Sequence, residues 1–151
     1  MDKEQQNLVI LSNKYRDEVM RLAQYLPWLE AHVDHSVSSN YDANGEMSTS
    51  LAFPVYDGNL LRMVKEAKNT QFIDKNYVYV YSRKRMRSVA DEKRAIEQAT
   101  MAEFDVLAAI LAKYVLTGMT KGKVWSEGVT SGVFYQVISK MKELVEFWGQ
   151  K

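Results

Sequence analysis

Apolar residues recur at helical spacing through much of the chain, beginning near the N-terminus. Between about residues 3 and 35 they fall on one stripe, and charged residues lie mostly off it. The stripe consists of Leu8, Leu11, Tyr15, Leu22, Leu26 and Leu29. Pro27 interrupts this pattern, because proline has no amide donor and clashes with the preceding turn. We therefore predict a long helix, a break near Pro27 and a short second helix that carries Trp28 and Leu29.

The clearest helical pattern is at the C-terminal end of the chain. Its apolar positions, spaced as on a buried helix face, are Phe134, Val137, Ile138, Met141, Leu144, Val145 and Trp148. An earlier apolar face is formed by Phe104, Leu107, Leu111, Tyr114 and Val115. Gly118 follows this face and is expected to end its helix, since glycine is common just after a helix.

Three polar stretches predict helix starts. Asp57 is expected to cap a helix over residues 58–69, whose inward positions are Leu60, Leu61, Val64 and Ala67. Residues 88–91 form a looser capping box that ends in aspartate, and residues 100–103 match the capping box itself, with Thr100 and Glu103 at its ends.

One polar loop stands out, over residues 36–50, and its Asn44–Gly45 pair signals a turn. Residues 48–53 could follow it as a strand, which leaves a small β-hairpin open as an alternative. The sequence predicts a single helical domain over residues 1–151, a mostly α bundle of about five or six helices.

Composition narrows the functional classes. The chain has 151 residues, 46% of them hydrophobic and 26% charged, with a net charge of +1, so overall charge gives no attraction to nucleic acid. It has no cysteine, which excludes disulfides, thiol nucleophiles and cysteine-bound metals. We find no apolar run of about 18 residues and no signal-peptide pattern, so we expect a cytoplasmic protein without membrane contact.

The segment "NYVYVYSRKRMRS", residues 76–88, combines alternating tyrosines with a cluster of cations. In a strand, the three tyrosines would share one face and stack a base, while the arginines would bind phosphates. In a helix, the rings would spread around the axis. Two structural interpretations also stay open: rings that fill a gap while the arginines pair with acids such as Asp91 and Glu92, or an edge strand protected by charge.

A glycine-rich stretch over residues 118–132 is the second candidate. Backbone amides at the next helix start could bind an anion, with help from Lys121 and Lys123. The spacing matches neither a P-loop nor a dinucleotide fingerprint. The structural alternative is that the glycines end helices or let two helices meet, with Trp125 as a packing plug.

Catalytic and metal-binding patterns are weak. His32 and His35 lie three residues apart, but they are the two histidines of the chain, and a metal needs at least one further ligand. Carboxylates such as Asp91, Glu92 and Glu97 are interpreted mainly as a solvated helix face. We predict no catalytic residue, no metal and no cofactor.

The stretch "YVLTGMTKGKVWSEGVTSGVFYQVISKMKELV", residues 114–145, resembles the tail of the DUF6508 family. In that family, helices flank a motif of the form Gly-Glu-Arg-aromatic-x-acid-Gly, then Ser-Gly and a leucine-rich helix. The positions that fit are Gly122, Trp125, Glu127, Gly128, Ser131 and Gly132. Lys123 and Val124 replace the family's Glu-Arg pair, which puts an arginine-based anion site there in doubt.

With a looser likeness over residues 53–69, the resemblance covers about two-thirds of the chain. It implies a small, mostly helical bacterial protein, often associated with phages or mobile elements. It implies no activity, because the family is uncharacterised and a fold alone does not set a function.

Together these observations predict a non-enzymatic accessory protein that binds, and sequesters, an anionic small molecule such as a nucleotide. The expected ligand-binding residues are Tyr77, Tyr79, Tyr81, Arg83, Arg85, Arg87, Lys123 and Trp125. Two alternatives are a protein–protein inhibitor or adaptor that acts on a host protein, through an amphipathic helix or the 36–50 loop, and a nucleic-acid-binding protein. Because the first and last helices offer wide apolar faces, a homodimer is also expected.

Overall fold

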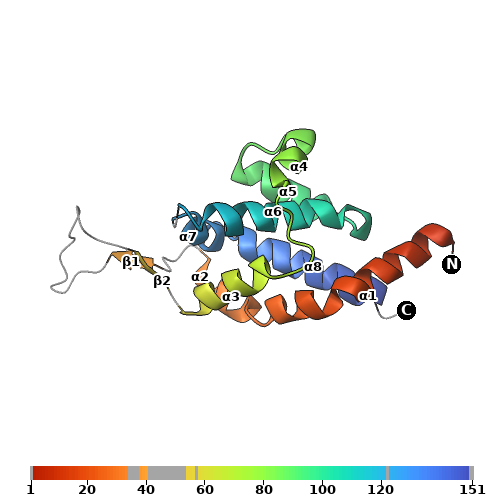
Figure 1. The fold of residues 1–151 in the computed structure, drawn as a ribbon, viewed down its shortest axis with the longest axis horizontal. Helices are drawn as coiled ribbons and strands as arrows, with labels where there is room; N and C mark the ends of the chain where they lie inside the picture. Colours follow the sequence, from red (N-terminus) through yellow and green to blue (C-terminus); the bar gives the residue numbers. More distant parts are fainter. Residues whose placement is uncertain (1, 34–37, 41–53, 57, 122, 150–151) are drawn as a thin grey trace.

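The computed structural model describes residues 2–33, 38–40, 54–56, 58–121 and 123–149. In this part of the chain the elements are α1 (Lys3–Ala23), α2 (Leu26–His32), β1 (Ser38–Asn40), β2 (Pro54–Tyr56), α3 (Gly58–Lys68), α4 (Tyr77–Lys84), α5 (Val89–Gln98), the 3-10 turn Met101–Glu103, α6 (Phe104–Thr117), α7 (Lys123–Thr130) and α8 (Val133–Gly149). The prediction of a mostly α protein is confirmed (Figure 1).

The predicted number of helices is wrong, since the described residues form eight α-helices. Two short ones account for much of the difference: α4 and α7, with eight residues each. Helices this short are not stable alone and depend on tertiary contacts, so their local sequence signals are weak. Their residues were interpreted as a binding segment and a glycine-rich turn.

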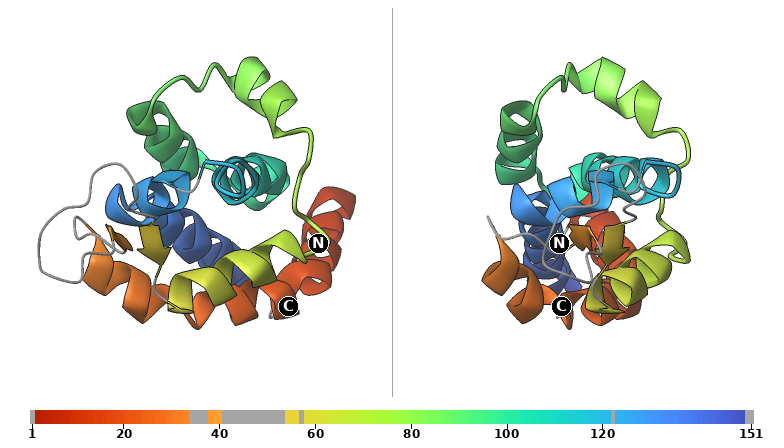
Figure 2. Two further views of the ribbon diagram at one scale, coloured as in Figure 1. Left: turned by 60° about the vertical axis from the view of Figure 1, so that its left-hand side comes forward. Right: turned by 90° about the vertical axis from the view of Figure 1, so that its left-hand side faces the viewer.

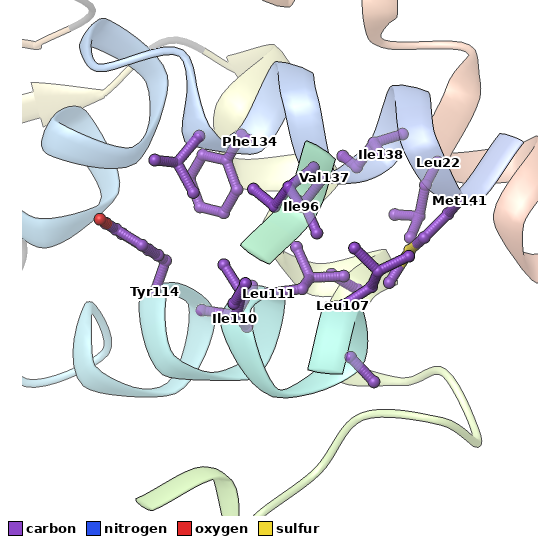
Figure 3. Packing of buried hydrophobic residues seen from close by; sticks show 14 of the residues in the cluster. Leu22, Ile96, Leu107, Ile110, Leu111, Tyr114, Phe134, Val137, Ile138 and Met141 are labelled. Atoms are coloured by element: carbon purple, nitrogen blue, oxygen red, sulfur yellow. The ribbon is translucent and has the colours of Figure 1, made fainter. Parts of the chain in front are cut away.

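Helix α6 forms the centre of the molecule. Ten of its residues are buried, on all sides of the helix, as expected for a helix that is apolar all round. It contacts α3, α4, α5, α7 and α8. Figure 3 shows Leu107 and Leu111 of α6 on the side of that helix toward Val137 and Met141 of α8.

Helices α1 and α8 form the most extensive helix pair. They run antiparallel, so that the start of α1 and the end of α8 lie at the same end of the molecule (Figure 1). The predicted stripe of α1 is confirmed: Leu22 is fully buried, and Leu8, Leu11 and Tyr15 contact the core. The two wide apolar faces therefore cover each other, which removes the argument for a homodimer based on surplus apolar surface. Dimerisation stays a prediction.

The predicted break near Pro27 is confirmed. Helix α1 ends at Ala23, and α2 begins at Leu26 with the proline in its first turn, where its missing amide costs no helical hydrogen bond. On α3, the inward positions Leu60, Val64 and Ala67 are confirmed, but Leu61 is exposed and Met63 is buried in its place.

The helix-start predictions have mixed outcomes. Ser88 caps α5 by accepting the backbone N–H of Asp91 at 3.2 Å. The capping box at Thr100 is wrong: Thr100 makes no side-chain cap, and the Glu103 carboxylate accepts from Lys84 Nζ at 2.9 Å. The Glu103 carboxylate pairs with a distant lysine, whereas a capping box requires that carboxylate to accept the backbone N–H of Thr100. The proposed cap at Asp57 lies outside the described residues.

The described strands form one short antiparallel pair. Ser38 lies opposite Tyr56 and Asn40 opposite Pro54. The strand proposed over residues 48–53 and the turn at Asn44–Gly45 lie outside the described residues, as does most of the 36–50 loop. No helix that the structure describes combines the length and the apolar character needed to cross a membrane.

Candidate functional site

Glu92 is a buried carboxylate at the junction of three helices. It lies on α5, one turn before the buried Ile96, so both side chains share the inward face of that helix. Only 1% of Glu92 is exposed, which is rare for a charged residue without partners. Its surroundings therefore need to supply hydrogen-bond donors.

Three donors from α4 and α6 meet this carboxylate. The Tyr81 hydroxyl donates to Glu92 Oε2 at 2.6 Å, and the Tyr114 hydroxyl donates to Oε1 at 2.6 Å. Lys113 Nζ donates to Oε2 at 3.0 Å. We call these four residues, Tyr81, Glu92, Lys113 and Tyr114, the Glu92 centre. It joins α4, α5 and α6 through one side chain.

Both tyrosines of the Glu92 centre are held in the protonated form. Burial, followed by the hydrogen bond to Glu92, raises the pKa of Tyr81 well above its ordinary value, and the same two causes raise the pKa of Tyr114. Lys113 Nζ lies 5.2 Å from the ring centroid of Tyr81 and 4.8 Å from that of Tyr114, within cation–π range. The centre is thus a fixed set of donors around one acceptor.

Three residues of the Glu92 centre, Glu92, Lys113 and Tyr114, line a cleft between α5, α6 and α7. The residues that line this α5–α7 cleft are Arg87, Ser88, Val89, Glu92, Lys113, Tyr114, Thr117, Thr120, Lys121, Val124 and Glu127. Its volume is about 600 Å³, within the range of small-molecule sites.

Two cations of the α5–α7 cleft have no acidic partner among the residues that the structure describes. The Lys113 ammonium is bound to Glu92, but the Arg87 guanidinium and the Lys121 ammonium form no ion pair there. The Arg87 backbone N–H donates to Asp91, which leaves its side chain available. The cleft therefore offers two uncommitted positive charges.

The three tyrosines of the 76–88 segment do not form one stacking platform. The segment is helical, so the strand interpretation is wrong, and residues two apart on a helix point in different directions. Tyr81 points inward and donates to Glu92. The Tyr77 ring packs edge to face against the Tyr81 ring, with the two ring centroids 6.3 Å apart. Tyr79 is 69% exposed on another side of α4. Of the three rings, none lines the α5–α7 cleft.

The cations of the same segment are also separated. Arg83 forms an ion pair with Asp105 at 2.8 Å, and its guanidinium lies 5.9 Å from the Tyr79 ring centroid. Arg85 ends α4 in a left-handed conformation, with φ of 56°, and lines a different cleft. Arg87 is the one arginine of the segment that lines the α5–α7 cleft.

Trp125 makes a packing contact within the glycine-rich stretch. Its indole N–H donates to the Val115 carbonyl at 3.0 Å, and a Cβ added at Gly118 would lie 2.0 Å from Trp125 Cδ1. Gly118 ends α6 as predicted, and its backbone is right-handed. Glycine is therefore needed here because a side chain would clash with Trp125, and not because the position requires a positive φ. Lys123 is exposed at the start of α7 and does not line the cleft.

Of the two histidines, the structure describes His32, which makes local contacts within its own helix. His32 Nδ1 lies 2.8 Å from the Trp28 carbonyl, and its ring stacks on Trp28 with centroids 4.4 Å apart. His35 lies outside the described residues. Among the residues described, no group of three or more histidine and carboxylate side chains could hold a metal ion.

Sequence reasoning missed the role of Glu92, which was interpreted as part of a solvated face. One signal was available: Glu92 and Ile96 are four residues apart, so a buried Ile96 places Glu92 on the buried face. Tyr114 was correctly placed among apolar positions, but nothing local indicated that its hydroxyl would meet a residue 22 positions earlier.

Comparisons with protein-family models, with curated proteins and with solved structures find no match to this chain. The resemblance to the DUF6508 family is neither supported nor refuted by them and stays a prediction. Function is therefore argued from the site itself.

Proposed function

We propose that this protein is a non-enzymatic binding protein for an anionic small molecule, and that the α5–α7 cleft receives the ligand. The supporting observation is the pair of uncommitted cations, Arg87 and Lys121, in a cleft of about 600 Å³. A guanidinium binds carboxylate or phosphate through two parallel hydrogen bonds, and an ammonium adds a flexible point charge.

The rest of the cleft supports a small ligand of modest charge. The Thr117 and Thr120 hydroxyls donate to backbone carbonyls, so their oxygens can accept from a ligand. Glu127 is exposed on the α7 side, and its negative charge disfavours a polyanion. Glu92 already accepts from three donors, so it is not available as a general base, which favours binding over catalysis.

A nucleotide is the most specific version of this proposal. Its phosphate suits Arg87 and Lys121, but Tyr77, Tyr79 and Tyr81 are outside the cleft lining and cannot stack its base there. The proposal therefore rests on the phosphate or another anionic group of the ligand, and not on stacking of a base. Sequestration of the ligand is part of this proposal, and an origin in a phage or mobile element rests on the family resemblance alone.

The test is a thermal-shift and calorimetric titration with inorganic phosphate, phosphomonoesters and mono-, di- and cyclic nucleotides. A ligand that binds the native state raises the melting temperature as its concentration exceeds Kd. We expect the double variant Arg87→Gln/Lys121→Gln to weaken binding about tenfold or more. Lys68→Gln is the matched control, since Lys68 is exposed on α3 and does not line the cleft. Equal affinity in the double variant and wild type would overturn the assignment.

An adaptor function is the second candidate, and one observation favours it. Val78 and Tyr79 are adjacent on α4, and 66% and 69% of them are exposed. Figure 2 shows α4 at the outside of the molecule, across α6 from α1 and α3. A host-protein partner that binds there should be lost from pull-downs with Val78→Ser/Tyr79→Ser, while the response to small anions is unchanged.

Nucleic-acid binding has less support, because Arg83 and Lys84 are already paired with Asp105 and Glu103. It predicts an affinity for DNA or RNA that falls steeply with salt. An affinity that is unchanged between low and moderate salt would exclude this alternative.

A further inference from the structure

The two outer walls of the α5–α7 cleft, formed by α5 and α7, carry the same order of side chains. Each wall presents a cation two residues before its helix begins, then a valine in the first turn, then a glutamate three residues after the valine. In this order the residues are Arg87, Val89 and Glu92 on the α5 side, and Lys121, Val124 and Glu127 on the α7 side. On both walls, apolar surface therefore follows an uncommitted cation along the chain.

The two valines offer this apolar surface to a ligand. Val89 is 41% exposed, and it lines a cleft rather than open surface. Val124 is partly buried against the core and also lines the cleft. A single exposed apolar side chain on an open surface is ordinary, but small-molecule sites combine apolar walls with a few polar groups that fix the orientation of the ligand. The cleft has both parts.

The same cleft is poorly suited to a planar base. Among the described residues that line it, Tyr114 is the one aromatic side chain, and only 3% of it is exposed. Its hydroxyl donates to Glu92, and Lys113 Nζ lies 4.8 Å from its ring centroid. Proteins commonly bind unpaired bases by stacking them on an accessible ring, which this lining does not offer. Aliphatic walls instead suit an aliphatic chain.

The charges of the lining favour a ligand with a single negative charge. Glu92 is paired with Lys113, which leaves Arg87 and Lys121 beside the exposed carboxylate of Glu127. Two cations and one carboxylate leave one uncompensated positive charge. One carboxylate on the ligand balances that charge, whereas a polyphosphate exceeds it.

We propose that the ligand of the α5–α7 cleft is an aliphatic carboxylic acid, with one carboxylate and an unbranched hydrocarbon chain. This inference rests on the proposed function and names the class of its ligand. The carboxylate accepts from Arg87 and Lys121, and the chain lies between Val89 and Val124. Inorganic phosphate, in contrast, meets only the cations and leaves both valines in water. The volume of about 600 Å³ suits a small molecule of this kind.

The test is a calorimetric titration of the full chain with acetate, butyrate, hexanoate and octanoate, with the weakly bound short acids measured by competition against octanoate. Each CH₂ group that leaves water contributes a similar free energy, so we expect the affinity to rise about two- to fourfold per added CH₂. Octanamide lacks the charge, and suberate carries a second carboxylate at the far end of the chain. Each should bind at least about tenfold more weakly than octanoate.

Variants separate the contribution of the carboxylate from that of the chain. Arg87→Gln/Lys121→Gln should weaken hexanoate and octanoate by a similar factor, about tenfold or more, and keep the gain per CH₂. Val89→Ser should reduce the gain from acetate to octanoate by about threefold or more and leave acetate binding unchanged. Val78→Ser is the matched control, since Val78 is 66% exposed on α4 and does not line the cleft. Val124→Ser should act like Val89→Ser, and Val89→Ser decides the matter alone if Val124→Ser fails to fold.

Four results would overturn the inference, and they distinguish it from the proposed function. Equal affinity for acetate and octanoate, with both weakened in Arg87→Gln/Lys121→Gln, means a simple anion site, so that only the aliphatic chain is wrong. No binding of phosphate, nucleotides or any acid at about 10 mM means that the proposed function is wrong as well. A chain-length dependence that is unchanged in Val89→Ser places the chain elsewhere. A mononucleotide that binds more tightly than octanoate means a different class of ligand.

Discussion

The apolar interface between α6 and α8 and the Glu92 centre are both buried, but they are built in different ways. In the first, Leu107 and Leu111 meet the apolar face of α8, and no hydrogen bond is needed (Figure 3). In the second, one carboxylate accepts from three side chains on two other helices. Apolar packing depends on volume and tolerates small shifts, whereas the Glu92 centre depends on the position of each partner.

This difference bears on how α4 is held. Val80 is the one buried residue of α4, and Tyr77 and Tyr81 pack against the core while partly exposed. Its Tyr81 is tied to Glu92, and its Arg83 and Lys84 form exposed ion pairs that contribute little. We infer that the position of α4 depends on the Glu92 centre, while α6 and α8 hold the fold as a whole.

The largest expected effect comes from a cavity in the apolar interface. Leu107 is fully buried, so Leu107→Ala should lower the free energy of unfolding by about 2 to 5 kcal/mol, measured by urea denaturation. The matched control is Leu61→Ala on α3, where 45% of the leucine is exposed. If both variants lose the same stability, burial does not distinguish these sites and the comparison fails.

The next effect comes from the removal of the shared acceptor. Glu92→Ala leaves Tyr81, Tyr114 and Lys113 without their partner, and we expect a loss of about 2 to 3 kcal/mol, since Lys113 is 37% exposed and can turn to water. Glu97→Ala, exposed on the same helix, is the control and should change little.

Amide hydrogen exchange on Glu92→Ala tests whether the Glu92 centre holds α4 in place. The amides of residues 77–84 should exchange faster by local opening, ahead of those of α8, whereas Leu107→Ala should affect both through global stability. Uniform acceleration in Glu92→Ala would show that α4 is not held by the Glu92 centre.

The smallest effect is that of a single hydroxyl. Tyr81→Phe should cost about 1 kcal/mol at neutral pH, because it removes one hydrogen bond to Glu92, and Tyr79→Phe on the exposed face should cost nothing measurable. A loss in Tyr79→Phe equal to that in Tyr81→Phe would contradict the assignment of Tyr81 to the centre.

The pH dependence of stability tests the same hydroxyls. Both tyrosines have pKa values raised in the folded state, so above about pH 10 the unfolded chain loses these protons first and the free energy of unfolding falls. Tyr81→Phe/Tyr114→Phe should show a shallower fall between about pH 9 and pH 11 than wild type, measured by urea denaturation. Identical slopes would mean that these groups titrate normally.

Much of the helical framework could be predicted from the sequence. The apolar periodicity of α1, α6 and α8, the break near Pro27 and the cap at Ser88 are local properties, because they depend on spacing and on groups a few residues apart. The resulting mostly α class follows from these signals. The short helices α4 and α7 were not predicted, since helices of that length depend on contacts with neighbouring helices for their stability.

Which residues come together in the candidate sites depends on the tertiary structure. Arg87 and Lys121 were noticed as cations in separate segments, but only the packing of α5, α6 and α7 brings them to one cleft. Whether Tyr81 stacks on a ligand or donates to a buried carboxylate, and whether Glu92 faces water or two hydroxyls, depends on contacts between residues 11 to 22 positions apart on different helices. Periodicity predicts which face of a helix is apolar, but only the tertiary structure determines which residues that face contacts.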